Sequence, residues 1–179
     1  MSSIFFEFIQ PILRVFSGGL SHWFGQDFWL TRFIFLRALG FIYLVAFLGV
    51  FLQFKGLFGK NGLLPAHLFL DRVAMNSGSG LKSFWSLPTV FWLHVSDQMM
   101  AILACIGVVL SAAVLFGLSN GVAMFVLWVI YISFVHVGQV FYGFGWESLL
   151  LETGFLAIFL YPFFNLSFFP AHHPPPKLI

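Results

Sequence analysis

The chain has 179 residues, of which 60% are hydrophobic and only 8% carry a formal charge. An ordinary soluble domain is about one quarter charged, so these few charges cannot cover a soluble protein of this size. The net charge of +2 comes from scattered basic residues and gives no reason to expect a nucleic-acid partner. Composition therefore excludes a soluble globular domain and favours an integral membrane protein surrounded by the lipid bilayer.

Residues 1–29 form the first predicted unit, an N-terminal segment that lies on the membrane instead of crossing it. Ile4 to Phe16 is apolar except for three polar residues at helical spacing, Glu7, Gln10 and Arg14. This stretch is too short and too polar to span a bilayer, so we expect an interfacial helix.

Residues 30–179 form the predicted membrane domain, an all-α transmembrane bundle of about four spanning helices. The first expected span covers residues 33–54 and contains a single charge, Arg37. An apolar helix of about 20 residues is long enough to cross the hydrocarbon core. Arg37 lies close to the start of this span, so it either reaches back to the headgroups or has a partner inside the bundle.

A polar loop over residues 55–97 follows the first span. It begins with turn-forming residues from Gly56 to Pro65, and we expect that stretch to be ordered but not helical. Phe84 to Val95 is aromatic but has only 12 residues. That length predicts an interfacial or re-entrant segment rather than a fifth span.

Two further spans come from an uncharged run that extends from Gln98 to Trp146. The run is too long for one crossing, and Ser119-Asn120-Gly121 breaks it with turn-forming residues. The expected spans are therefore residues 99–118 and 122–141. The first of these carries a stripe of small residues at helical spacing, which usually marks close packing of another helix. The members of the stripe are Ala101, Ala104, Gly107 and Ser111.

The fourth expected span covers residues 147–164 and carries Glu147 and Glu152 near its start. A carboxylate in the hydrocarbon region costs about 2–3 kcal/mol or more, so we expect Glu152 to face the bundle and find a partner there. Glu147 is expected to reach the interface and stay hydrated. Because successive spans run in opposite directions, the start of the fourth span is expected beside the end of the third span. The polar cluster predicted there comprises His136, Gln139, Tyr142, Trp146, Glu147 and Glu152.

The predicted cluster has two interpretations. It is either a site for a proton, a lipid headgroup or a small ligand, or a set of hydrogen bonds that only fastens the third span to the fourth. No motif of a familiar catalytic class is present, so no catalytic residue is assigned and an enzyme is not expected. The histidines are dispersed, with only His172 and His173 adjacent, and Cys105 is the sole cysteine. Neither a metal nor a cofactor is therefore predicted.

Three blocks of the sequence resemble the lipase maturation factor family. They are residues 30–40, the turn-rich block Gly56 to Pro65, and the longest block, Val137 to Leu156, which reads VGQVFYGFGWESLLLETGFL. Eukaryotic members of that family are membrane proteins of the endoplasmic reticulum that help secreted lipases such as lipoprotein lipase fold and assemble. The resemblance implies a cytosolic N-terminus, with the polar loop and the start of the fourth span facing the lumen.

The resemblance predicts a membrane-embedded module that assists the folding of a secreted lipase or another client. Its expected location is the endoplasmic reticulum membrane in a eukaryote, or the cytoplasmic membrane in a bacterium. The family's large C-terminal domain is expected to be absent, so the module should be incomplete and work with a lipase or a separate C-terminal domain. The alternative function is a membrane-embedded enzyme that acts on a lipid or quinone through the cluster around Glu147 and Glu152.

Overall fold

The computed structural model describes residues 29–78, 81–117 and 120–160, and every regular element in these ranges is helical. The all-α prediction is therefore confirmed for this part of the chain. The predicted interfacial helix at residues 4–16 and the paired histidines of the tail lie outside the described residues. The elements in chain order are α3 (Trp29–Leu57), α4 (Ala66–Ser77), α5 (Leu81–Ser86), η2 (Val90–Trp92), α6 (Asp97–Phe116), α7 (Gly121–Val137), η3 (Gln139–Tyr142) and α8 (Gly145–Leu160).

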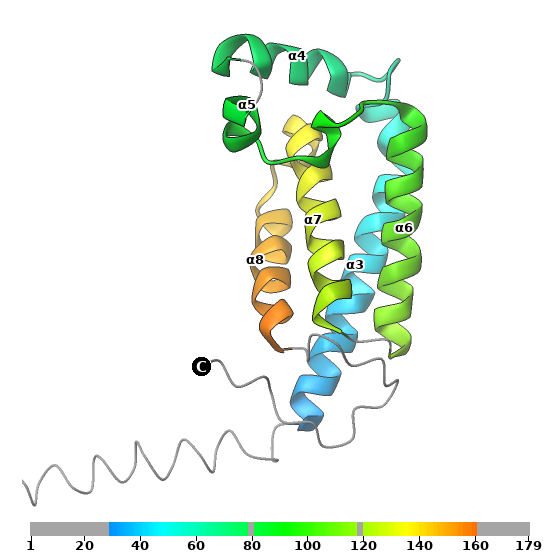
Figure 1. The fold of residues 1–179 in the computed structure, drawn as a ribbon. Coiled ribbons are helices and arrows are strands. Elements are labelled where there is room, and N and C mark those ends of the chain that lie inside the picture. Colours follow the sequence, from blue (N-terminus) through cyan, green and yellow to red (C-terminus); the bar gives the residue numbers. More distant parts are fainter. Residues whose placement is uncertain (1–28, 79–80, 118–119, 161–179) are drawn as a thin grey trace, which may run out of the picture.

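Four helices, α3, α6, α7 and α8, form a bundle with their axes roughly side by side (Figure 1). Helices α3 and α7 run in one direction and α6 and α8 run in the other, as alternating spans require (Figure 1). The end of the bundle where α3 ends and α6 begins is called the loop end below. Helix α4 lies across this end, and α5 packs against α4 (Figure 1).

Two of the bundle helices are long and apolar enough to cross a membrane: α3, over Phe33–Leu57, and α6, over Asp97–Phe116. The 20 residues of α6 correspond to about 30 Å of helix, the thickness of a hydrocarbon core. Helix α7 is apolar but has only 17 residues, and α8 has 16 within the described chain. That α7 and α8 also cross the membrane therefore remains a prediction. Helix α7 is short for a span, and the last residues of the expected fourth span, 161–164, lie outside the described part.

The predicted third span extended to residue 141, which is wrong by one helical turn. Helix α7 ends at Val137, and the backbone of Gln139 has a φ of 52°. An L-residue in this left-handed region interrupts an α-helix, so the chain continues as the 3-10 turn η3. Glutamine has no special preference for positive φ, so this break in the helix could not be predicted from the sequence.

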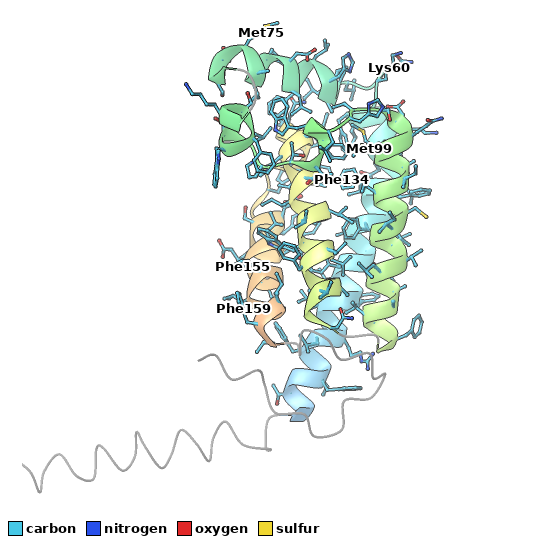
Figure 2. All side chains as sticks on the ribbon, in the orientation of Figure 1. Lys60, Met75, Met99, Phe134, Phe155 and Phe159 are labelled. Atoms are coloured by element: carbon cyan, nitrogen blue, oxygen red, sulfur yellow. The ribbon has the colours of Figure 1, made fainter. Side chains whose placement is uncertain are left out.

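The outer surface of the bundle is mainly apolar on each of the four helices, with Glu152 of α8 among the exposed polar residues. Exposed side chains include Leu52 on α3, Val109 on α6, Phe125 on α7 and Leu149 on α8. Phe155 and Phe159 also lie on the outer side of α8 (Figure 2). Such a surface suits contact with lipid chains, which agrees with the membrane location expected from composition.

The stripe of small residues on α6 faces α3, and these two helices make the most extensive contact in the described chain. Ala104, Gly107 and Ser111 are buried there. The ring of Phe47 occupies the space that a Cβ atom on Gly107 would take. The prediction that this stripe marks close packing of a neighbouring helix is confirmed.

The turn-rich stretch after α3 is ordered by its own backbone. The amides of Leu63 and Leu64 donate to the carbonyls of Gly56 and Leu57, at 3.0 and 2.9 Å. The amide of Lys60 donates to Oδ1 of Asp97 at 2.8 Å, which ties the end of α3 to the start of α6. The stretch is ordered as predicted, although α3 continues three residues beyond the expected end of the span.

Candidate functional site

Two residues of the predicted cluster, Tyr142 and Glu147, lie together at the loop end. Glu147 stands in the first turn of α8 and is only 2% exposed. Tyr142 is half-buried, and its ring packs against Phe58 with 5.9 Å between centroids. Gly138 leaves the space for this ring, because a Cβ there would overlap it. Burial, and then the nearby Glu147 carboxylate, raise the pKa of Tyr142 to about 12.

Two further tyrosines, which the predicted cluster did not include, complete the group: Tyr43 from α3 and Tyr131 from the middle of α7. Tyr131 of α7 is fully buried, and its ring meets that of Tyr43 of α3 edge to face at 5.7 Å. The hydroxyl of Tyr131 lies within electrostatic range of Tyr142, Glu147 and Tyr43. We call these four residues, Tyr43, Tyr131, Tyr142 and Glu147, the buried polar centre.

Hydrogen bonding in the buried polar centre is incomplete. The hydroxyl of Tyr43 donates to the carbonyl of Leu150 at 3.4 Å, and it occupies the space that a side chain on Gly154 would need. In contrast, the Tyr131 hydroxyl and Oε2 of Glu147 are buried without a hydrogen-bond partner among the residues that the structure describes. Each such group costs about 1–3 kcal/mol of stability. Groups of this kind inside a membrane protein mark a candidate site, because packing alone does not explain them.

His136 and Gln139, also from the predicted cluster, are engaged elsewhere. Nδ1 of His136 lies 2.9 Å from the carbonyl of Pro88, and Nε2 of Gln139 donates to the carbonyl of Leu64 at 3.2 Å. Both side chains hold loop segments against the end of α7. They stabilise the loop end and have no contact with Glu147 among the described hydrogen bonds.

The expected roles of the two glutamates are reversed in the structure. Glu152 is exposed on the outer surface of α8, and Glu147, expected to stay hydrated, is buried. Trp146 is also exposed, on the surface beside Glu147. The reason is helical spacing, since the inner face of α8 repeats every three to four residues from Glu147. That face consists of Glu147, Leu150, Gly154, Ala157 and Ile158.

Arg37 has its partner inside the bundle, at the end opposite the loop end. Nη1 donates to the carbonyl of Leu115 at 2.7 Å and to that of Val114 at 3.4 Å. The guanidinium also lies 4.5 Å from the centroid of the Phe33 ring. The last carbonyls of a helix lack intrahelical donors and form its negative end. Arg37 therefore caps α6, which is the second of the two alternatives considered from the sequence.

Tyr43 and Tyr131 were missed because each stands in a long apolar run. The chain has only four tyrosines, and three of them meet in the buried polar centre. A phenol in the middle of an apolar span still needs a hydrogen-bond partner, and this was the available signal. Within the described ranges, no group of three or more His, Cys, Asp or Glu side chains is placed to hold a metal ion. The centre offers a carboxyl group and phenols, which are groups that can donate and accept hydrogen bonds.

Comparison with known proteins places the chain in a family. The model of the lipase maturation factor transmembrane domain matches residues 30–179. Lipase maturation factor 1 of Mus musculus is 45% identical over 158 residues, which cover 85% of this chain and 28% of the relative. The Homo sapiens protein of the same name is 43% identical over 169 residues, covering 91% and 30%. Lipase maturation factor 2 of Xenopus laevis is 41% identical over 144 residues, covering 74% and 19%.

No solved structure matches this chain. The chain spans less than one third of the length of each of these relatives. The family model nevertheless covers most of the chain, including the whole bundle and the buried polar centre. The chain therefore belongs to the lipase maturation factor family and contains its transmembrane domain.

Proposed function

We propose that this chain is the membrane-embedded module of a lipase maturation factor, and that it assists the folding and assembly of a secreted lipase or a similar client. The observation that carries the proposal is the match of residues 30–179 to the family's transmembrane domain. The relatives are named for lipase maturation and are 41–45% identical over the matched region in mouse and frog. In a eukaryote, the module works in the endoplasmic reticulum membrane with its loop end toward the lumen.

The contribution of the module is to hold a platform at the loop end. Hydrogen bonds that involve a side chain hold the loop segments there to the bundle and to one another: the Lys60 amide to Asp97 of α6, His136 of α7 to the Pro88 carbonyl, and Gln139 of η3 to the Leu64 carbonyl. These contacts fix α4 and its neighbours relative to the membrane. A platform of fixed height and orientation suits the presentation of a client, or of a further domain, to the lumen.

The positions of Glu147 and Glu152 do not favour the alternative of an enzyme that acts through both of them. It required both carboxyl groups in one cluster, and they lie on opposite sides of α8, one buried and one exposed. The relatives are named as maturation factors, and none of these names describes a lipid- or quinone-converting activity.

A segment exchange tests the proposal. Residues 30–179 replace the matching segment of the Mus musculus lipase maturation factor 1, and the chimera is expressed in cells that lack the endogenous factor. We expect secreted lipase activity close to that given by the parent protein. The matched controls are chimeras with Gly107→Ala, which disrupts the α3–α6 contact, and Gly49→Ala, where a Cβ meets open space. We expect activity to be lost in the first and kept in the second. A chimera that accumulates like the parent in the same membrane, but leaves the lipase inactive, would contradict the proposal.

A further inference from the structure

We infer that the segment formed by α5 and η2, residues 81–93, lies in the headgroup–acyl boundary of the bilayer at the loop end, with Phe84, Trp85 and Leu93 inserted into lipid. The partner is the lipid surface itself. This inference goes beyond the proposed function and does not depend on it, because it concerns how the module is seated in the membrane.

The first support is the depth at which the segment contacts the bundle. The amide of Val90 donates to Oγ of Ser133 at 3.0 Å, and Oγ1 of Thr89 donates to the Ser133 carbonyl at 3.4 Å. The ring of Phe91 packs edge to face on Phe134 at 5.2 Å. Ser133 stands four residues before the end of α7 at Val137, which is about 6 Å along the helix axis. The segment is therefore folded down beside the last turn of α7.

The second support is where the membrane boundary falls. Helix α6 has the length of the hydrocarbon core, and it begins at the loop end with Ser96 as its N-cap and Asp97 in its first turn. Helix α7 ends at the same end and is shorter, about 25 Å for its 17 residues. Its last turn therefore lies close to the edge of the core. A segment held beside this turn is at the depth of about 5–10 Å that interfacial elements adopt.

The third support is the outward surface of the segment. Trp85 is 80% exposed and Leu93 is 83% exposed, and Phe84 is exposed as well. Residues 81–93 contain no acidic residue and one charge, Lys82, whose long side chain is able to reach the headgroups. Tryptophan is the residue most typical of the membrane–water interface.

The fourth support is that the irregular backbone of the segment is provided with partners, as contact with lipid requires. The amide of Leu87 donates to the carbonyl of Ser83 at 3.0 Å, and the amide of Leu93 donates to that of Val90 at 3.1 Å. The indole of Trp92 donates to the carbonyl of Leu87 at 2.8 Å. These bonds reduce the need for water around the segment.

Helix α4 provides the contrast. Its exposed residues include Asp71, Arg72 and Asn76 as well as Leu68 and Met75. A mixed and charged surface of this kind suits water and disfavours lipid. Met75 is 83% exposed, as Leu93 is, but it projects from the far side of α4, away from the bundle (Figure 2). Two side chains of equal exposure are therefore expected in different surroundings.

The test uses environment-sensitive probes on single cysteines in the Cys105→Ser background, in phosphatidylcholine nanodiscs. Probes are placed by Trp85→Cys, Leu93→Cys and, as the matched control, Met75→Cys. We expect the probes at residues 85 and 93 to emit at shorter wavelength than the probe at residue 75. Lipid-borne nitroxide should quench them at least about twofold more strongly than it quenches the control, because only they lie at interfacial depth. A water-soluble quencher should show the opposite order.

A further variant, Ser86→Cys, keeps Trp85 in place and puts the probe on the next residue of α5, which is also exposed, if the tryptophan replacement prevents folding. Aqueous quenching at residues 85, 86 and 93 equal to that at residue 75 would overturn the inference. A probe shielded from both quenchers would place the segment in a protein contact, such as a second copy of the chain, and would overturn it as well.

Discussion

The α3–α6 and α7–α8 helix pairs differ in what fills the space between their helices. Between α3 and α6, small residues let the backbones approach, and the Phe47 ring lies directly over Gly107. Arg37 of α3 also caps the last carbonyls of α6. Between α7 and α8, the indole of Trp128 donates to the carbonyl of Leu151 at 2.9 Å. The same region contains the buried polar centre, with its unpaired atoms.

This difference indicates a division of labour within one bundle. Close contact between small residues gives dispersion energy and shape complementarity, which is how helices associate in lipid. Unpaired buried polar atoms lower stability, and proteins retain such features mainly at functional sites. We therefore expect α3–α6 to provide most of the stability, whereas α7–α8 carries a group kept for function. Substitutions in the two helix pairs should therefore differ in their effect on stability and on function.

The largest effect is expected for Gly107→Ala. A Cβ at this position overlaps the ring of Phe47, and this ring is fully buried, so it would have to shift against packed neighbours. Overpacking of this kind should lower the free energy of unfolding by about 3 kcal/mol. Thermal or denaturant unfolding in detergent measures the change. Gly49→Ala on α3 is the matched control, because its Cβ meets nothing within 4 Å. Equal stability of the two variants would mean that α3 and α6 do not pack as closely as described.

Arg37→Met is expected to lower the free energy of unfolding by about 2 kcal/mol, the typical effect of losing a hydrogen bond from a charged donor. The replacement keeps the apolar stem but leaves the Leu115 carbonyl without this donor. Unfolding is measured in neutral detergent, where no anionic headgroup contributes. Arg37→Lys keeps the charge and should recover part of the loss. If Arg37→Met leaves the free energy of unfolding unchanged, Arg37 interacts with the lipid headgroups and does not stabilise α6.

Gly154→Ala tests the contact between α8 and the rest of the bundle, and we expect a loss of about 1–2 kcal/mol. The new Cβ overlaps the hydroxyl of Tyr43, a side chain from α3. In the Tyr43→Phe background the hydroxyl is gone, so the same substitution should be less harmful. A double-mutant cycle measured by thermal unfolding gives the coupling energy directly. Additive effects in that cycle would show that Tyr43 does not contact α8 at this position.

Much of the fold follows from local features of the sequence. Apolar runs and the turn at Ser119-Asn120-Gly121 gave the direction of the helices, and the small residues around Gly107 gave the α3–α6 contact. These features are local because hydropathy, turn propensity and helical spacing are carried by neighbouring residues. The ordered loop after α3 was predicted for the same reason.

The candidate site was predicted only in part, because it depends on the rotation of each helix about its axis. Glu152 was predicted to face inward because it lies deeper along α8 than Glu147. In the structure, Glu147 shares the buried face of the helix with Leu150 and Gly154, at helical spacing. Tyr43 and Tyr131 come from helices far apart in sequence, so their contact cannot be inferred from local pattern. The early end of α7 depends on the left-handed backbone of Gln139, a residue type that gives no such signal.

The smallest effect on stability is expected for Glu147→Leu. Oε2 of Glu147 is buried and has no hydrogen-bond partner in the described part of the chain, so its removal relieves an unpaired group. Leucine has a similar volume and fits among apolar neighbours such as Leu150. Replacement of a buried polar group by an apolar one of similar shape is often neutral or stabilising. We therefore expect Glu147→Leu to lower the free energy of unfolding by less than about 1 kcal/mol or to raise it, in contrast to Gly107→Ala. Thermal unfolding in detergent measures the change.

The same variant should separate stability from function. In the mouse chimera, we expect Glu147→Leu to accumulate normally and to give clearly less secreted lipase activity, because the carboxyl group is absent while the bundle is intact. Glu152→Leu is the matched control on the same helix, and it should keep both stability and activity because Glu152 lies on the outer surface. A loss of more than about 2 kcal/mol for Glu147→Leu would indicate a carboxyl group that fastens α8 to the bundle. The two helix pairs would then both be structural, and the α7–α8 pair would no longer be distinguished as the site of function.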